Sequence, residues 1–221
     1  MVFSILRSAG ALALLTLTTT NAFPTARQAP NYAPTLQSST FTLVANVTSH
    51  DLSPSVNDWV VSSYHTGAGT GYAVLVAADQ GGREFYVNGT AEEVRYNEAS
   101  IASDGGSPPF PFGIVINEPA NSVSINAGLG EKGVGLTRFP DPVPKLHGAP
   151  NGGWFACNSA LPFGDAVQLF SLPLGDTAPE GCASVVLLPQ CAADSGVEHP
   201  FTNIINCYED VAGIDWTIYS A

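Results

Sequence analysis

Alternation of apolar and other side chains with a period of two residues restricts the fold of this chain more than any other feature. Within the segment Phe41–Thr48, the odd positions carry Phe41, Leu43, Ala45 and Val47, while Thr, Asn and one Val fill the even positions. Because successive side chains of a β-strand point to opposite faces, this pattern indicates a strand with one buried face. Shorter apolar runs separated by Gly, Pro and Asn extend the expectation to most of the chain.

These signals predict roughly 11–13 strands and almost no helix. Further strands are expected at residues 59–64, 72–78, 83–87, 93–96, 113–117, 122–126, 134–139, 154–158, 167–172, 184–188, 204–208 and 216–219. Loops are expected at 101–111 and 140–153, and helical turns at 54–58 and 208–213. No domain boundary is visible, so we predict a single antiparallel all-β domain over residues 40–220, as a β-sandwich or, alternatively, a barrel-like closed sheet.

The first 22 residues have the pattern of a secretory signal peptide. Arg7 precedes an apolar stretch from Ala9 to Leu17, and small or modest residues surround a cleavage position after Ala22. The apolar stretch is shorter than the ~20 residues that a membrane-spanning helix needs. We therefore expect a secreted protein that works outside the cell, in or near the cell wall, with an extended tail over residues 23–39 and no membrane insertion.

Four cysteines, Cys157, Cys182, Cys191 and Cys207, lie in the last third of the chain. In an oxidising compartment an even set forms disulfides, and the spacing typical of a zinc site is absent. A Cys182–Cys191 bridge is disfavoured because a strand between them separates the Cα atoms by ~30 Å, against ~4.4–6.8 Å in a disulfide. Of the three possible pairings, we favour Cys157–Cys191 with Cys182–Cys207.

Two N-glycosylation sequons and an excess of acidic residues predict properties of the protein surface. Asn46-Val47-Thr48 and Asn88-Gly89-Thr90 match the N-glycosylation pattern, so Asn46 and Asn88 are expected at exposed positions. The chain has 19 acidic against 7 basic residues and a net charge of -12. Because this excess repels phosphates, it argues against nucleic acid and against anionic membrane surfaces as partners.

The motifs of several enzyme classes are absent, including G-x-S-x-G, H-E-x-x-H and the P-loop. His65 stands at a predicted strand end beside glycines and is a candidate for acid–base or ligand contact, although a structural role is commoner for such a residue. Carboxylates on predicted turns allow a catalytic dyad or a surface calcium site, although solvated charges are commoner. We expect no resident cofactor and favour a non-enzymatic protein. The alternative is a hydrolase that uses a carboxylate dyad, or His65 with a carboxylate.

Aromatic side chains offer another kind of site, since their apolar faces stack on sugars. Trp59 lies on a predicted strand, where the core is its commoner place. Phe110 and Phe112 lie in a Pro-rich stretch, where they are either exposed or plug one end of the sheet. These three aromatic residues and His65 are the predicted ligand or cleft candidates, and no catalytic or metal-binding residue is assigned.

Four stretches form a specific combination: Pro54–Trp59, Tyr64–Gly69, Phe85–Tyr96 and Pro108–Gly113. Together they resemble a group of small secreted proteins of filamentous ascomycete fungi that is catalogued as an uncharacterised domain of unknown function. The resemblance covers about Phe41 to Cys191 and implies a fungal secreted protein, without a residue-level mechanism. We therefore expect an acidic glycoprotein that is a binding module of the cell surface or wall, or an effector. Its expected partner is a cell-wall polysaccharide or a host extracellular protein.

Overall fold

A computed structural model describes residues 31–138, 140–148, 152–193, 197 and 199–219. The predicted signal peptide, over residues 1–22, lies outside the described residues, as does the predicted tail up to residue 30. The described part of that tail contains β1 (Leu36–Ser38), which pairs antiparallel with β14 (Ile205–Cys207). No helix in the described part of the chain is long and apolar enough to cross a membrane.

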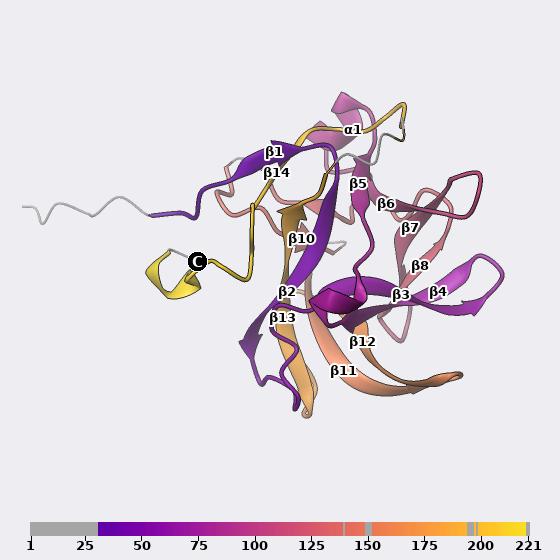
Figure 1. The fold of residues 1–221 in the computed structure, drawn as a ribbon, viewed down its shortest axis with the longest axis vertical. Coiled ribbons are helices and arrows are strands. Elements are labelled where there is room, and N and C mark those ends of the chain that lie inside the picture. Colours follow the sequence, from indigo (N-terminus) through magenta and orange to yellow (C-terminus); the bar gives the residue numbers. More distant parts are fainter. Residues whose placement is uncertain (1–30, 139, 149–151, 194–196, 198, 220–221) are drawn as a thin grey trace, which may run out of the picture. The chain divides into compact units, whose positions relative to one another are not determined.

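Ten antiparallel strands form the main sheet, in the order β11-β13-β2-β3-β4-β12-β8-β7-β6-β5 (Figure 1). Their bounds are β2 (Phe41–Ser49), β3 (Val60–Gly67), β4 (Thr70–Val76), β5 (Phe85–Asn88), β6 (Ser100–Gly105), β7 (Phe110–Asn117), β8 (Ser122–Ala127), β11 (Gly153–Leu161), β12 (Gly164–Leu172) and β13 (Cys182–Cys191). A separate pair joins β9 (Gly135–Leu136) to β10 (Leu146–His147). The short helices are η1 (Ala78–Gln80), α1 (Ala91–Arg95) and η2 (Trp216–Ile218).

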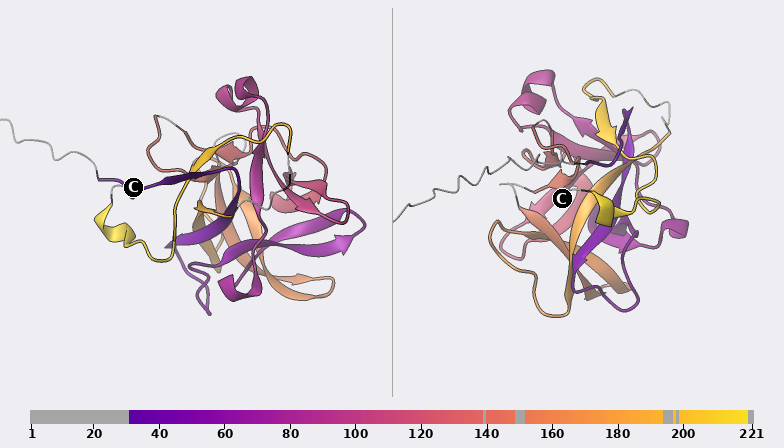
Figure 2. Two further views of the ribbon diagram at one scale, coloured as in Figure 1. Left: turned by 45° about the horizontal axis from the view of Figure 1, so that its top comes forward. Right: turned by 90° about the vertical axis from the view of Figure 1, so that its left-hand side faces the viewer.

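Additional pairings close the main sheet on itself. β11 pairs with both β12 and β13, and β2 pairs with β5 through Phe41 and Phe85. The strands therefore run around a shared interior, as Figures 1 and 2 show. The predicted all-β, antiparallel class is confirmed. The ring-like closure pairs backbone groups that a sheet edge would leave open.

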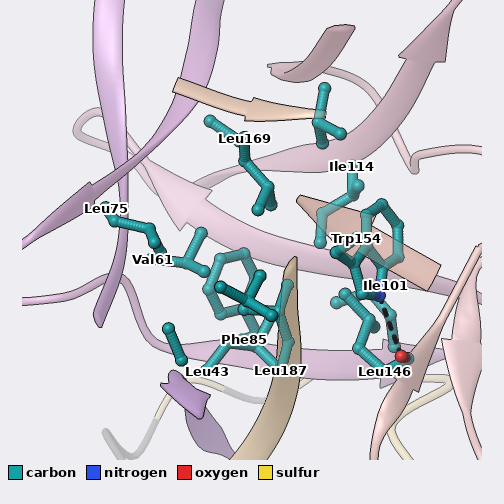
Figure 3. Close-up of a cluster of buried hydrophobic side chains, with 14 of the residues drawn as sticks. Leu43, Val61, Leu75, Phe85, Ile101, Ile114, Leu146, Trp154, Leu169 and Leu187 are labelled. Carbon is teal, nitrogen blue, oxygen red and sulfur yellow. Dashed lines mark hydrogen bonds between the residues drawn. The ribbon is translucent and has the colours of Figure 1, made fainter. Parts of the chain in front are cut away.

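Alternation along the strands fills this interior with apolar side chains (Figure 3). Phe41, Leu43 and Ala45 of β2 are fully buried, as the alternation predicts. Trp154 of β11 is 2% exposed, and its Nε1 donates to the backbone oxygen of Leu146 at 2.9 Å. This hydrogen bond satisfies the only polar atom of the indole and ties β10 to the core.

Two disulfides form, but the favoured crossed pairing is wrong. Cys157 bonds Cys182, and Cys191 bonds Cys207. Because β11 and β13 are neighbours, their register places Cys157 directly opposite Cys182, with the Cα atoms 4.5 Å apart. That separation is typical of a non-hydrogen-bonded antiparallel pair. The prediction that a Cys182–Cys191 bridge is disfavoured is confirmed, since these residues stand at opposite ends of β13 and bond other cysteines.

The predicted strand at residues 93–96 is wrong, because local capping favours a helix there. Thr90 is the N-cap of α1: its Oγ1 accepts from the backbone nitrogen of Glu93 at 3.2 Å, and Glu93 Oε2 accepts from the backbone nitrogen of Thr90 at 2.8 Å. This reciprocal capping box satisfies donors at the helix start. The Asn88-Gly89 pair therefore leads into a helix instead of a hairpin.

Other differences concern the ends of the predicted elements. The expected loop at 101–111 contains most of β6, whose Ile101 and Ala102 are fully buried. The expected strand at 216–219 is mainly η2, where Asp215 Oδ1 accepts from the backbone nitrogen of Thr217 at 3.0 Å. The segments 54–58 and 208–213 contain turns without a helix. The predicted strand at 134–139 is reduced to β9, and the loop at 140–153 contains β10.

Candidate functional site

The outer face of β2, β3 and β13 is covered by the C-terminal segment after β14, drawn in yellow in Figure 2. Tyr208 and Val211 are 1% and 0% exposed and pack with Leu188 in a second apolar cluster. Val211 donates its backbone N–H to Gln190 Oε1 at 2.9 Å, and Trp216 Nε1 donates to the Val211 oxygen at 3.3 Å. The first bond ties the segment to β13, and the second is internal to the segment and folds it on itself.

A groove of about 390 Å³ lies between this segment, β2, β13 and the loop 141–145. Its walls include three aromatic side chains, Tyr32, Trp216 and Tyr219, and we call it the aromatic groove. Trp216 packs edge-to-face on Tyr208, with ring centroids 5.2 Å apart and an interplanar angle of 89°. Its indole is therefore held in place while one side borders the groove. The apolar lining also includes Pro142, Val143, Val186 and Leu188.

Polar side chains line the other part of the aromatic groove. Asn46 and Thr48 of β2 lie on the same face as the groove floor. Asp141 and Lys145 stand on the loop, with Oδ2 and Nζ 3.6 Å apart. Asp141 Oδ1 also accepts from the backbone nitrogen of Val143 at 3.1 Å, which orients the carboxylate. An amide, a hydroxyl, a carboxylate and an ammonium group thus line one cavity with the aromatic rings.

Burial and charge act on Tyr208 beneath the groove. Desolvation, and secondarily the charge of Asp141, raise the pKa of the Tyr208 hydroxyl to about 12. Its hydroxyl therefore stays protonated near neutral pH. The apolar layer under Trp216 is thus uncharged over the range in which an extracellular protein works.

This combination suits a neutral polyhydroxy ligand. Aromatic faces pack on the apolar face of a sugar ring, and the amide, carboxylate and ammonium groups can exchange hydrogen bonds with hydroxyls. The volume falls in the ~300–1,000 Å³ range of small-molecule sites. Of the described residues that line the groove, Asp141 is the one carboxylate, and it is ion-paired, so these residues do not form a pair of acids with separated pKa values. Among the described residues, no group of three His, Cys, Asp or Glu side chains could hold a metal ion.

The sequence-predicted candidates lie elsewhere. His65 is exposed near the end of β3, opposite Gly71 of β4. Trp59 is partly buried and packs on the main core. Neither of them lines the aromatic groove. Of the two predicted glycosylation sites, Asn46 lines the groove, whereas Asn88 lies on β5 outside it.

Phe110 and Phe112 form a contact of their own at the start of β7. Their rings meet edge-to-face with centroids 6.2 Å apart. Phe110 is 53% exposed, while Phe112 packs on the core beneath the guanidinium of Arg83, 5.5 Å from the ring centroid. The pair therefore combines both expectations, with one ring at the surface and one covering the core.

The structure also brings a histidine and a carboxylate together, but the histidine is His199. Its Nε2 lies 3.1 Å from Asp104 Oδ2, and its ring stacks on Tyr86 with centroids 3.8 Å apart. Both residues line a cavity of about 310 Å³ that also includes Glu84, whose Oε1 is buried without a hydrogen-bond partner among the described residues. Burial, and secondarily the charge of Asp104, raise the pKa of Tyr86 to about 12. Among the described residues, no carboxylate is paired with His65. Asp104 is paired with His199, so the structure places a histidine–carboxylate pair at His199 and not at His65.

Sequence reasoning missed Tyr32, Trp216 and Tyr219 as site residues. They stand near the two ends of the described chain, and the groove forms only because both ends lie beside β2 and β13. No local motif signals such an arrangement. The concentration of aromatic residues in the last segment, Tyr208, Trp216 and Tyr219, is the one sequence feature that points toward it.

Comparison with known proteins identifies relatives by sequence. The model of a family described as a domain of unknown function (DUF7907) matches residues 38–191. The chain is 36% identical over 214 residues to the antigenic protein SchS34 of Stachybotrys chartarum, a match that covers 86% of this chain and 95% of the relative. No solved structure matches the chain. The family expected from the four sequence motifs is thereby confirmed: this chain belongs to the fungal domain family DUF7907, whose function is unknown.

Proposed function

We propose that this protein is a secreted, non-enzymatic module that binds a neutral polysaccharide of the fungal wall through the aromatic groove. The observation that carries the proposal is the placement of Tyr32, Trp216 and Tyr219 around one cavity with an amide and an ion-paired carboxylate. Sugars present apolar faces and hydroxyls together, and this lining offers partners for both.

Secretion is supported by several independent features. The N-terminal pattern of Arg7 followed by Ala9–Leu17 is typical of a signal peptide. Two disulfides suit an oxidising compartment. The relative from Stachybotrys chartarum is named an antigenic protein, which agrees with exposure outside the cell. The acid excess favours uncharged ligands over polyanions.

The test is calorimetric titration of purified protein without N-glycans with hexasaccharides of β-1,3-glucan and of chitin. We expect Trp216→Ala and Tyr219→Ala each to weaken binding by about 2–10-fold, because an aromatic contact contributes about 0.5–1.5 kcal/mol. Tyr96→Ala is the matched control, since Tyr96 is 63% exposed and lies outside the aromatic groove. Equal losses for Tyr96 and Tyr219, or no binding by the unmodified groove, would remove the basis of the proposal.

The pair of His199 and Asp104 supports a second candidate function, that of an extracellular hydrolase. The same hexasaccharides distinguish the two functions, because an enzyme releases shorter sugars with time. Asp104→Asn would stop such release while leaving Trp216-dependent binding unchanged. Intact hexasaccharides after prolonged incubation would favour the binding module.

A further inference from the structure

The sequon at Asn46 opens into the aromatic groove. Asn46 lies two positions after Val44, which packs in the outer cluster, and it stands opposite Val186 of β13 in the strand register. Asn46, Thr48 and Val186 all line the groove. Any group attached to the amide nitrogen of Asn46 therefore starts inside the groove, beside the aromatic rings.

The local contacts leave the Asn46 amide available. Within the part of the chain that the structure describes, no hydrogen bond involves its side chain. Thr48, the hydroxyl residue of the sequon, donates through Oγ1 to the backbone oxygen of Ser184 at 3.2 Å. The folded strand thus holds Thr48 in place, while the Asn46 side chain has no hydrogen-bond partner to lose among the described residues.

We propose that an N-linked glycan on Asn46 occupies the aromatic groove and blocks polysaccharide binding. In protein without this glycan the groove is open to the polysaccharide. The inference rests on the proposed function, since it describes the regulation of the same groove. Attachment forms a bond between the Asn46 amide nitrogen and the anomeric carbon of an N-acetylhexosamine. The amide loses one proton, and a lipid diphosphate leaves from the glycan donor. The linked sugar is then the first ring to meet Trp216, Tyr219 and Tyr32.

Tethering makes this internal occupant effective against a free ligand. A group linked to the wall of its own site acts at a high effective concentration, in the millimolar range for short flexible links. A free oligosaccharide that packs on the same aromatic faces must displace it. Asn88 provides the contrast, because it is the last residue of β5 and does not line the groove.

The experiment compares variants secreted from a fungal host that adds N-glycans, with intact mass spectrometry to report occupancy. Asn46→Gln and Thr48→Ala remove the first sequon, and Asn88→Gln, outside the groove, removes the second. We expect the first two variants to bind β-1,3-glucan hexasaccharide at least tenfold more tightly than the glycosylated protein, while Asn88→Gln stays within twofold of it. An unoccupied Asn46, or equal affinity of occupied protein and Asn46→Gln, would overturn the inference.

A second readout separates failure of this inference from failure of the proposed function. Acrylamide quenching of tryptophan fluorescence reports on Trp216, because Trp154 is 2% exposed and Trp59 lies outside the groove. Treatment with a peptide N-glycosidase, which also removes the sugar linked to Asn46, should increase quenching of the occupied protein and leave Trp216→Phe unchanged, even when no hexasaccharide binds any variant. That result would reject the polysaccharide as ligand and keep the glycan in the groove. Unchanged quenching after removal of the glycan would show that the glycan does not occupy the groove.

Discussion

Tyr208 shows how one side chain links the core to the candidate site. It is 1% exposed, packs against Trp216, and hydrogen-bonds through its backbone to the strand β13: its N–H donates to the Pro189 oxygen at 2.8 Å. Its ring thus supports the indole that borders the aromatic groove. The sequence could place Tyr208 on a predicted strand, but its partners are set by how the last segment crosses β13, which no local pattern encodes.

The raised pKa of Tyr208 predicts a loss of stability at alkaline pH. The unfolded hydroxyl ionises near ~10, whereas the folded one has a pKa of about 12. The unfolded state therefore loses its proton first, so stability is fully present below pH 10 and falls as the pH rises to 12. Urea unfolding at pH 9, 10 and 11 should show this fall, and Tyr208→Phe should reduce it.

The contribution of Tyr86 to the alkaline loss of stability must be separated from that of Tyr208, because burial also raises the pKa of Tyr86 to about 12. The double variant Tyr86→Phe with Tyr208→Phe should have the smallest alkaline loss, and each single variant an intermediate one. An unfolding free energy of Tyr208→Phe that falls as steeply as that of the unmodified protein would contradict the buried, uncharged hydroxyl.

At the scale of elements, alternation and turn residues predict the central strands well. The segment Phe41–Thr48 becomes β2 with its odd positions inside, and the expected hairpin at 113–126 forms β7 and β8. Prediction fails at α1, where the capping box of Thr90 and Glu93 outweighs the hairpin signal of Asn88-Gly89. It also fails for the disulfide pairing, because the neighbours of β13 depend on sheet order rather than on spacing along the chain.

The two disulfides should differ in their effect on the groove although both stabilise the fold. Replacing either pair by alanine should cost about 2–4 kcal/mol, because each bridge restricts the unfolded chain. Cys191–Cys207 joins β13 to β14, just before the segment that carries Trp216, whereas Cys157–Cys182 joins neighbouring strands of the sheet. We expect faster amide exchange over residues 208–219 only when the Cys191–Cys207 pair is replaced.

The matched variant is Cys157→Ala with Cys182→Ala, compared by hydrogen–deuterium exchange at equal fractions folded. Faster exchange of residues 208–219 in both double variants would mean that this segment follows global stability. Amide exchange in this segment would then not depend specifically on the Cys191–Cys207 disulfide.

For the molecule as a whole, the sequence predicts the class but not the closure. An apolar interior lined by alternating strands follows from composition and period, and the all-β fold with two disulfides is confirmed. Closure through β2–β5 and β11–β12, and coverage of one outer face by the C-terminal segment, arise from contacts between residues far apart in the chain. The aromatic groove is a product of that coverage, and no local sequence pattern reports it. The candidates that local patterns predict therefore lie elsewhere in the structure: Trp59, His65, Phe110 and Phe112.

Recognition of sugar by the aromatic groove is the central claim, and a nuclear magnetic resonance titration tests it most directly. Isotope-labelled Asn46→Gln protein is titrated with β-1,3-glucan hexasaccharide, and amide and tryptophan indole shifts are followed. We predict saturable shifts for the Trp216 indole and for residues of the groove, including Val186 and Lys145. Shifts confined to the cavity of Asp104 and His199, or the absence of any saturable shift, would contradict the account.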